Sequence, residues 1–249
     1  MNAQQWLKYY QRNRVDRPEP KWNSPSSLKR DAQQILGHSL SHFQLGETGE
    51  GKVLISGASR QVGDDACYIE ALTMFVAEEG EHARLLDRLV RRFGGKIIHR
   101  HWTHGLFRLV RHALGFKFEI QLLVIAELVG TAYYRLLRVR SSDSVLDETC
   151  ALLLTDEAKH IEFHADWLGN FMARLLPLEY AIWAIQFQVL FTAAAYVAWI
   201  DHRHALRISG SCRREFFKEA RGECIRFLRS LEQNAEEQVK PFAPVPVVS

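Results

Sequence analysis

The sequence contains one charged pattern twice, and this repeat constrains the fold more than any other feature. Residues 78–82, EEGEH, and residues 156–160, DEAKH, both read acid–Glu–x–x–His. On a helix, positions i and i+3 share a face, so the Glu and His of each stretch can point to the same place. Carboxylate and neutral imidazole together suit first-row metals such as iron, manganese and zinc. The repeat therefore predicts two helices that each present one Glu/His pair.

A further glutamate precedes each pair at a similar distance. Glu47 lies 32 residues before Glu79, and Glu127 lies 30 residues before Glu157. An antiparallel hairpin that turns near Ser141 would place Glu127 and Glu157 at the same height. Because a single Glu-x-x-His is common by chance, the prediction depends on the doubled spacing. Four carboxylates at one level would repel one another, and two divalent cations would neutralise them.

Composition favours an all-α protein. Hydrophobic residues make up 47% of the 249-residue chain, seven prolines are too few for a loop-rich β fold of this length, and no strand pair is evident. Helices are predicted at about 28–56, 65–94, 114–138, 144–176, 178–207 and 212–238, with a loop at 57–63 and a turn at 140–143. We expect a single domain. Residues 1–27 form an N-terminal arm with a short helix near 4–11, and residues 28–176 form a bundle. Residues 177–238 add further packed helices, and residues 239–249 form an extended tail.

Six residues together resemble the ligand set of the ferritin-like di-iron carboxylate proteins: Glu47, Glu79, His82, Glu127, Glu157 and His160. The resemblance covers roughly residues 28–176. It implies a four-helix bundle that holds two iron ions, or a Mn/Fe pair. It further implies that Glu79 and Glu157 bridge or chelate, that each histidine binds one metal, and that Glu47 and Glu127 are terminal ligands.

The same resemblance implies a supporting role for neighbouring residues. The acid before a Glu-x-x-His pair typically holds a metal-bound histidine through its other ring nitrogen, which points to Asp156 and, in the corresponding place, Glu78. His164, one turn after His160, is a further candidate near the metals, although a packed core histidine is an equal interpretation. Tyr133 and Tyr134 follow Glu127 on the same helix, where packing is favoured over a redox role.

One ligand position is ambiguous in the sequence. Glu47 and Glu50 both lie on the glycine-interrupted segment, and Glu47 is preferred because it shares a helical stripe with Leu40 and Leu54. Each candidate also has an ordinary interpretation: the Glu/His pairs as surface ion pairs, and Glu127 as a hydrogen-bonded core carboxylate.

The resemblance implies a non-haem di-iron oxidoreductase with dioxygen as co-substrate. Its small organic substrate would undergo hydroxylation, N-oxygenation, desaturation or oxidative cleavage, which the ligands do not distinguish. The alternatives are a ferritin-like ferroxidase or iron-binding protein, a membrane-surface quinone hydroxylase or oxidase, and a metal-free helical scaffold.

Expectations about partners come from charge and hydropathy. The basic stretch 84–112 would dock an external electron donor such as a ferredoxin or reductase, or form a solvated face, while a net charge of +3 does not call for nucleic acid. Four dispersed cysteines and a polar N-terminus predict a cytoplasmic protein, and a homodimer is compatible with these features. Residues 180–200 carry no formal charge, and we expect a buried core helix there rather than a membrane helix. Its aromatic residues are expected to line a substrate pocket.

Overall fold

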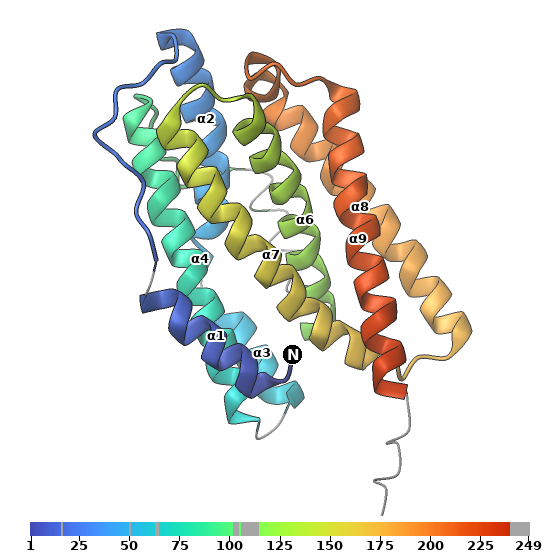
Figure 1. Ribbon diagram of the computed structural model, residues 1–249. Coiled ribbons are helices and arrows are strands. Elements are labelled where there is room, and N and C mark those ends of the chain that lie inside the picture. Colours follow the sequence, from blue (N-terminus) through green and yellow to red (C-terminus); the bar gives the residue numbers. More distant parts are fainter. Residues whose placement is uncertain (16, 50, 63–64, 102–104, 106–114, 240–249) are drawn as a thin grey trace, which may run out of the picture.

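The computed structural model describes residues 1–249 except 16, 50, 63–64, 102–104, 106–114 and 240–249. No strand occurs in this described part, so the all-α prediction is confirmed (Figure 1). The helices are α1 (Ala3–Val15), α2 (Arg30–Glu47), α3 (Lys52–Val62), α4 (Ala66–Arg92), α6 (Phe116–Arg140), α7 (Ser144–Met172), α8 (Pro177–Ile208) and α9 (Arg213–Val239).

The helices pack around a central hairpin. Helices α6 and α7 form this hairpin, because only residues 141–143 separate them, as the sequence predicted. Helices α8 and α9 pack against the hairpin, and α2 and α4 lie together (Figure 1). Helix α4 contacts α7, and α2 also contacts α8. The carboxylates and histidines of the repeated pattern therefore lie on helices that share one core.

Side-chain caps explain where two of these helices begin. The Asp65 carboxylate accepts a hydrogen bond from the Tyr68 backbone N–H at 3.0 Å and caps α4. The Asp143 carboxylate does the same for the Leu146 N–H, also at 3.0 Å, and caps α7. Each cap satisfies a backbone donor that the first turn of a helix leaves unpaired.

The prediction for residues 28–63 is wrong in two respects. Instead of one helix over 28–56, α2 ends at Glu47 and α3 begins at Lys52, and the loop predicted over 57–63 is helical as far as Val62. The chain between α2 and α3 passes so close to α4 that a Cβ on Gly51 would lie 2.2 Å from Val76 Cγ1. Glycine thus allows a contact that a longer residue would block, and the helix breaks there.

The N-terminal segment is more than a polar arm. Trp6, Leu7 and Tyr10 of α1 are buried, and α1 packs against α4. The Trp6 indole N–H donates to Asp166 Oδ2 at 2.7 Å, which ties α1 to α7 as well. Burial of these side chains, absent from the sequence prediction, brings Asn13 and Arg17 into contact with acids of α4 and α7.

The expectation that α8 is a buried core helix is also wrong. Helices α6 and α8 are both long and apolar enough to span a bilayer, but 83% of the most apolar window of α6 is buried, against 22% of that of α8. One face of α8 packs inward through four aromatic residues: Trp183, Phe187, Phe191 and Trp199. The opposite face is exposed.

The inward aromatic residues of α8 fill an interface between helices. The rings of Phe187 and Phe227 stack with centroids 5.4 Å apart, and the Trp183 indole N–H donates to Gln121 Oε1 at 3.0 Å. Tyr196, a fifth aromatic residue of this helix, is 45% exposed. The shallow apolar hollow on α8, lined by residues such as Ile185 and Val189, lies on the outward face.

Candidate metal centre

The six residues predicted as ligands converge in the folded chain. Helix α2 contributes Glu47, α4 contributes Glu79 and His82, α6 contributes Glu127, and α7 contributes Glu157 and His160. They form three overlapping groups in which one ligand atom per residue lies within 4.8 Å of the others: Glu79, His82 and His160; Glu47, His82 and Glu157; Glu127, Glu157 and His160. The two histidines and Glu157 each belong to two groups, so the residues form one continuous cluster.

The Nδ1 atoms of both histidines face the carboxylates of this cluster. His82 Nδ1 lies 3.4 Å from Glu157 Oε1 and 3.7 Å from Glu79 Oε1. His160 Nδ1 lies 3.0 Å from Glu79 Oε1, 3.5 Å from Glu157 Oε2 and 3.7 Å from Glu127 Oε2. Glu79 and Glu157 thus approach both histidines, whereas Glu127 approaches only His160.

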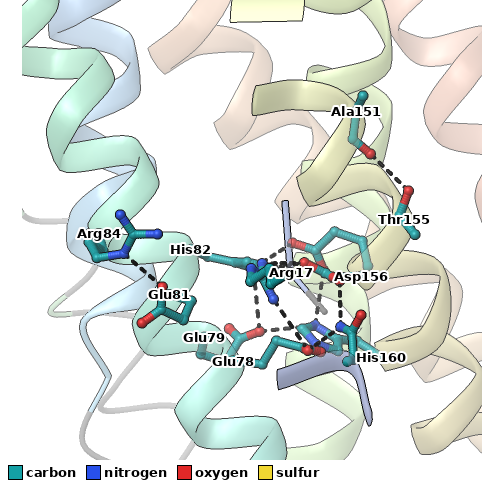
Figure 2. Close-up of polar contacts among 12 residues, drawn as sticks. Arg17, Glu78, Glu79, Glu81, His82, Arg84, Ala151, Thr155, Asp156 and His160 are labelled. Atoms are coloured by element: carbon teal, nitrogen blue, oxygen red, sulfur yellow. Dashed lines mark hydrogen bonds and ion pairs between the residues drawn. The ribbon is translucent and has the colours of Figure 1, made fainter. Parts of the chain in front are cut away.

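The other ring nitrogen of each histidine is held by an acid from the opposite helix. His82, on α4, pairs through Nε2 with Asp156 Oδ2 of α7 at 3.1 Å. His160, on α7, pairs through Nε2 with Glu78 Oε2 of α4 at 2.9 Å. Figure 2 shows this exchange between the two helices. Each carboxylate fixes the plane of an imidazole and directs its Nδ1 toward the cluster.

Two residues of the N-terminal segment hold these supporting acids in turn. The Asn13 side-chain amide donates to both Glu78 and Asp156. The Arg17 guanidinium pairs with Glu78 Oε1 at 3.3 Å and with Asp156 Oδ2 (Figure 2). Sequence reasoning missed both residues, because nothing in the local sequence of a polar arm shows that it packs across α4 and α7.

The interior of the cluster contains polar atoms that the protein leaves unsatisfied. Four buried atoms have no hydrogen-bond partner: His82 Nδ1, His160 Nδ1, Glu79 Oε1 and Glu157 Oε2. His160 Nδ1 and Glu79 Oε1 lie 3.0 Å apart, which is an ion-pair distance when the ring is protonated. Buried polar atoms without partners are costly and rare. Imidazole nitrogens and carboxylate oxygens facing one space are a donor set that fits divalent first-row metals.

The electrostatics show how strongly these residues interact without metal. Burial acts to lower the pKa of His82, but Asp156 and Glu157 outweigh it and raise that pKa to about 9. Burial acts to raise the pKa of Glu79, yet contact with His160 and the charge of His82 lower it to about 2. Protonated histidines therefore stabilise the neighbouring carboxylates when no metal is bound.

Glu47 occupies a different position from the other carboxylates. It is the last residue of α2, is partly buried, and accepts a hydrogen bond from the Tyr134 hydroxyl at 3.4 Å. Burial and the nearby negative charges of Glu79 and Glu157 raise its pKa well above the usual range. Glu50, the rival candidate, lies outside the described residues. Tyr134 thus touches a predicted ligand, while the Tyr133 hydroxyl shares a hydrogen bond with Ser39 at 2.6 Å.

The remaining sequence candidates lie apart from the cluster. His164 is fully buried, and its ring meets the edge of Phe75 with centroids 4.8 Å apart, so it packs beside the centre without joining the ligand groups. In the basic stretch, Arg84 and Arg88 pair with Glu19, and Arg92 donates to the carbonyls of Trp22 and Ser24. These contacts hold the segment before α2. The part of the stretch at 102–104 and 106–112 lies outside the described residues.

Comparison of the chain with protein-family models, curated proteins and solved structures gives no match. The interpretation of the centre therefore depends on its own geometry.

Proposed function

We propose that the chain is a ferritin-like di-iron carboxylate protein, an oxidoreductase that uses dioxygen to oxidise a small organic substrate. The observation that supports this most is the pair of facing histidines with unsatisfied Nδ1 atoms, 3.0 to 3.7 Å from carboxylates of three helices. In this proposal α2, α4, α6 and α7 are the bundle, and the six clustered residues hold two iron ions.

The shared carboxylates have the central role. Glu79 and Glu157 approach both histidines, so in this proposal they would contribute to both ion positions, while Glu47 and Glu127 would each serve one. Bound iron supplies the redox chemistry with dioxygen. Because Glu78 and Asp156 accept from histidine Nε2, the imidazoles keep their orientation when the Nδ1 protons leave.

The surroundings of the histidines limit access of water. The edge of Phe75 meets the His160 ring with centroids 4.7 Å apart, and the Tyr10 ring lies 6.4 Å away. Both aromatic residues are buried, as are His82 and His160. A dry environment strengthens the electrostatic interactions of the centre and protects reactive species from side reactions.

Iron loading followed by oxygen exposure tests this proposal against the ferroxidase alternative. The di-ferrous protein should hold about two irons per chain, as two-metal sites do. On mixing with oxygen it should react once at that stoichiometry. Continued oxidation of added iron into a mineral, together with a large shell on size-exclusion chromatography, would favour iron storage. Protein with less than about one iron per chain after reconstitution would contradict a dinuclear centre.

A membrane-surface oxidase is a second candidate, supported by the exposed face of α8. Five large residues at helical spacing are 45 to 66% exposed on this face: Ile182, Ile185, Val189, Tyr196 and Ile200. An apolar stripe of this kind is typical of helices that lie in a membrane interface. Cosedimentation with anionic phospholipid vesicles should then fall in an Ile185→Glu/Val189→Glu variant and persist in Ile225→Glu, a control at an exposed position of α9. Absence of vesicle binding by the unaltered protein would reject this candidate.

A further inference from the structure

A second group of metal-binding residues lies outside the carboxylate cluster. It consists of His42 on α2, His101 in the segment after α4, and Asp201 on α8, and one ligand atom from each lies within 4.8 Å of the others. These three residues are widely separated in the sequence. Only the packing of α2 against α8, and the path of the chain after α4, brings them together.

The geometry of this group favours an ion over simple packing. The His42 and His101 rings lie with centroids 4.2 Å apart. His42 Nδ1 is buried and has no hydrogen-bond partner. All three residues are partly exposed, so an ion can reach them from solvent. An imidazole with an unused nitrogen beside a second imidazole and a carboxylate presents the donor types of a zinc-type site.

We propose that His42, His101 and Asp201 form a mononuclear site for a divalent first-row transition ion, separate from the carboxylate cluster. Two imidazoles and one carboxylate suit Zn²⁺, Co²⁺ or Fe²⁺ better than Mg²⁺ or Ca²⁺, which prefer oxygen ligands. Three protein ligands leave a coordination position for water or a small molecule. His42 precedes Glu47 by five residues on α2, which is about 7.5 Å along the helix axis, and no residue is common to the two sites.

A bound ion would also have a structural consequence. Its ligands come from α2, α8 and the segment between α4 and α6, so the ion would cross-link three parts of the chain. Since an ion that binds only the folded state stabilises it, this site would anchor the segment after α4 to the helices.

Equilibrium dialysis against Zn²⁺, with bound zinc measured per chain by mass spectrometry, tests the site. We expect His42→Ala, His101→Ala and Asp201→Asn each to bind about one zinc fewer than the unaltered protein. The matched control is His204→Ala, which removes an exposed histidine from the helix that carries Asp201. Circular dichroism of each variant verifies the fold, and Asp201→Asn is the most conservative change.

Two results separate the possibilities. Loss of about one zinc in the three variants, with no loss in His204→Ala, supports the site whatever the carboxylate cluster binds. Zinc content in folded Asp201→Asn and His42→Ala equal to that of the unaltered protein overturns it. A Co²⁺ titration gives an independent reading, because the site should contribute a visible absorption band that is absent from the same variants.

Discussion

The carboxylate cluster consists of two halves: Glu47, Glu79 and His82 from α2 and α4, and Glu127, Glu157 and His160 from α6 and α7. The two halves have the same sequence pattern but differ in local structure. In both, the histidine is fully buried and its Nε2 is held by an acid of the other half, at 3.1 Å for His82 and 2.9 Å for His160. The halves differ in the remaining carboxylate. Glu127 lies in the middle of the continuous helix α6, whereas Glu47 is the final residue of α2.

This difference shows that similar spacing in sequence does not guarantee similar placement. Glu127 is 7% exposed and lies 3.7 Å from a histidine nitrogen. Glu47 is held by the Tyr134 hydroxyl and lies where the helix ends before the glycine-containing break. A carboxylate at a helix end has more backbone freedom than one in a helix interior, so the α2 half should tolerate change better.

The largest loss of bound iron is expected on removal of a carboxylate that lies near the histidines of both halves. Glu157 lies 3.4 Å from His82 Nδ1 and 3.5 Å from His160 Nδ1, so Glu157→Ala should abolish stable binding of both iron ions. Glu162→Ala, on the exposed side of α7, is the control and should retain iron. Retention of about two irons per chain by Glu157→Ala, measured after reconstitution, would show that Glu157 is not a ligand of the proposed centre.

Substitution of Glu127 and of Glu47 tests directly whether the two halves differ. Glu127→Ala should lose about one iron per chain. Glu47→Ala should lower iron occupancy or reactivity with dioxygen to a smaller extent, because its position is less constrained. Glu50→Ala should have little effect. Iron content and the rate of oxygen consumption measure both properties, and a larger effect for Glu50 than for Glu47 would reject the proposed register of the first helix.

Substitution of either supporting acid, Glu78 or Asp156, should weaken metal binding to a similar extent if the two histidines are held in the same way. Glu78→Gln and Asp156→Asn each remove the charge that orients one histidine, and each should weaken metal binding by about 10- to 100-fold. Competition with a chelator of known affinity measures the change. A strong effect in one variant and none in the other would show that only one histidine depends on its partner acid.

Arg17 contacts the supporting acids of both halves, so its removal should affect the two together. Arg17→Met should lower the free energy of unfolding of the metal-free protein by about 2 kcal/mol, since buried charge-assisted hydrogen bonds to Glu78 and Asp156 are left unmade. Urea unfolding measures this change. Arg12→Met, at an exposed position of α1, is the control, and an equal effect there would show that Arg17 has no special role.

The most gradual effect concerns pH. The pKa of His82 is raised to about 9 in the metal-free protein, so the protonated ring contributes stability that is fully present below its unfolded pKa of about 6.5. This contribution should be lost as the pH rises through about 9. Metal binding has the opposite dependence, because the proton on Nδ1 must leave first. Unfolding of metal-free protein and metal titrations, both between pH 6.5 and 9.5, should therefore show opposite trends.

Local patterns in the sequence determined most of the helices and the residue types of the candidate centre. The Glu-x-x-His spacing, the caps at Asp65 and Asp143 and the short turn at 141–143 all depend on neighbours within a few residues, and the structure has the helices where these patterns place them. The four-residue break after Glu47 was less accessible, because glycines weaken a helix without specifying where it stops.

Only the tertiary structure decided which residues meet across the molecule. The exchange of Asp156 and Glu78 between the histidines, the reach of Arg17 into the centre, and the meeting of His42 with Asp201 join residues 61 or more positions apart. The exposure of one face of α8 likewise depends on which helices pack against it. Helix periodicity predicts which side chains share a face. The direction in which that face points, and the residues that it contacts, depend on how all the helices pack together.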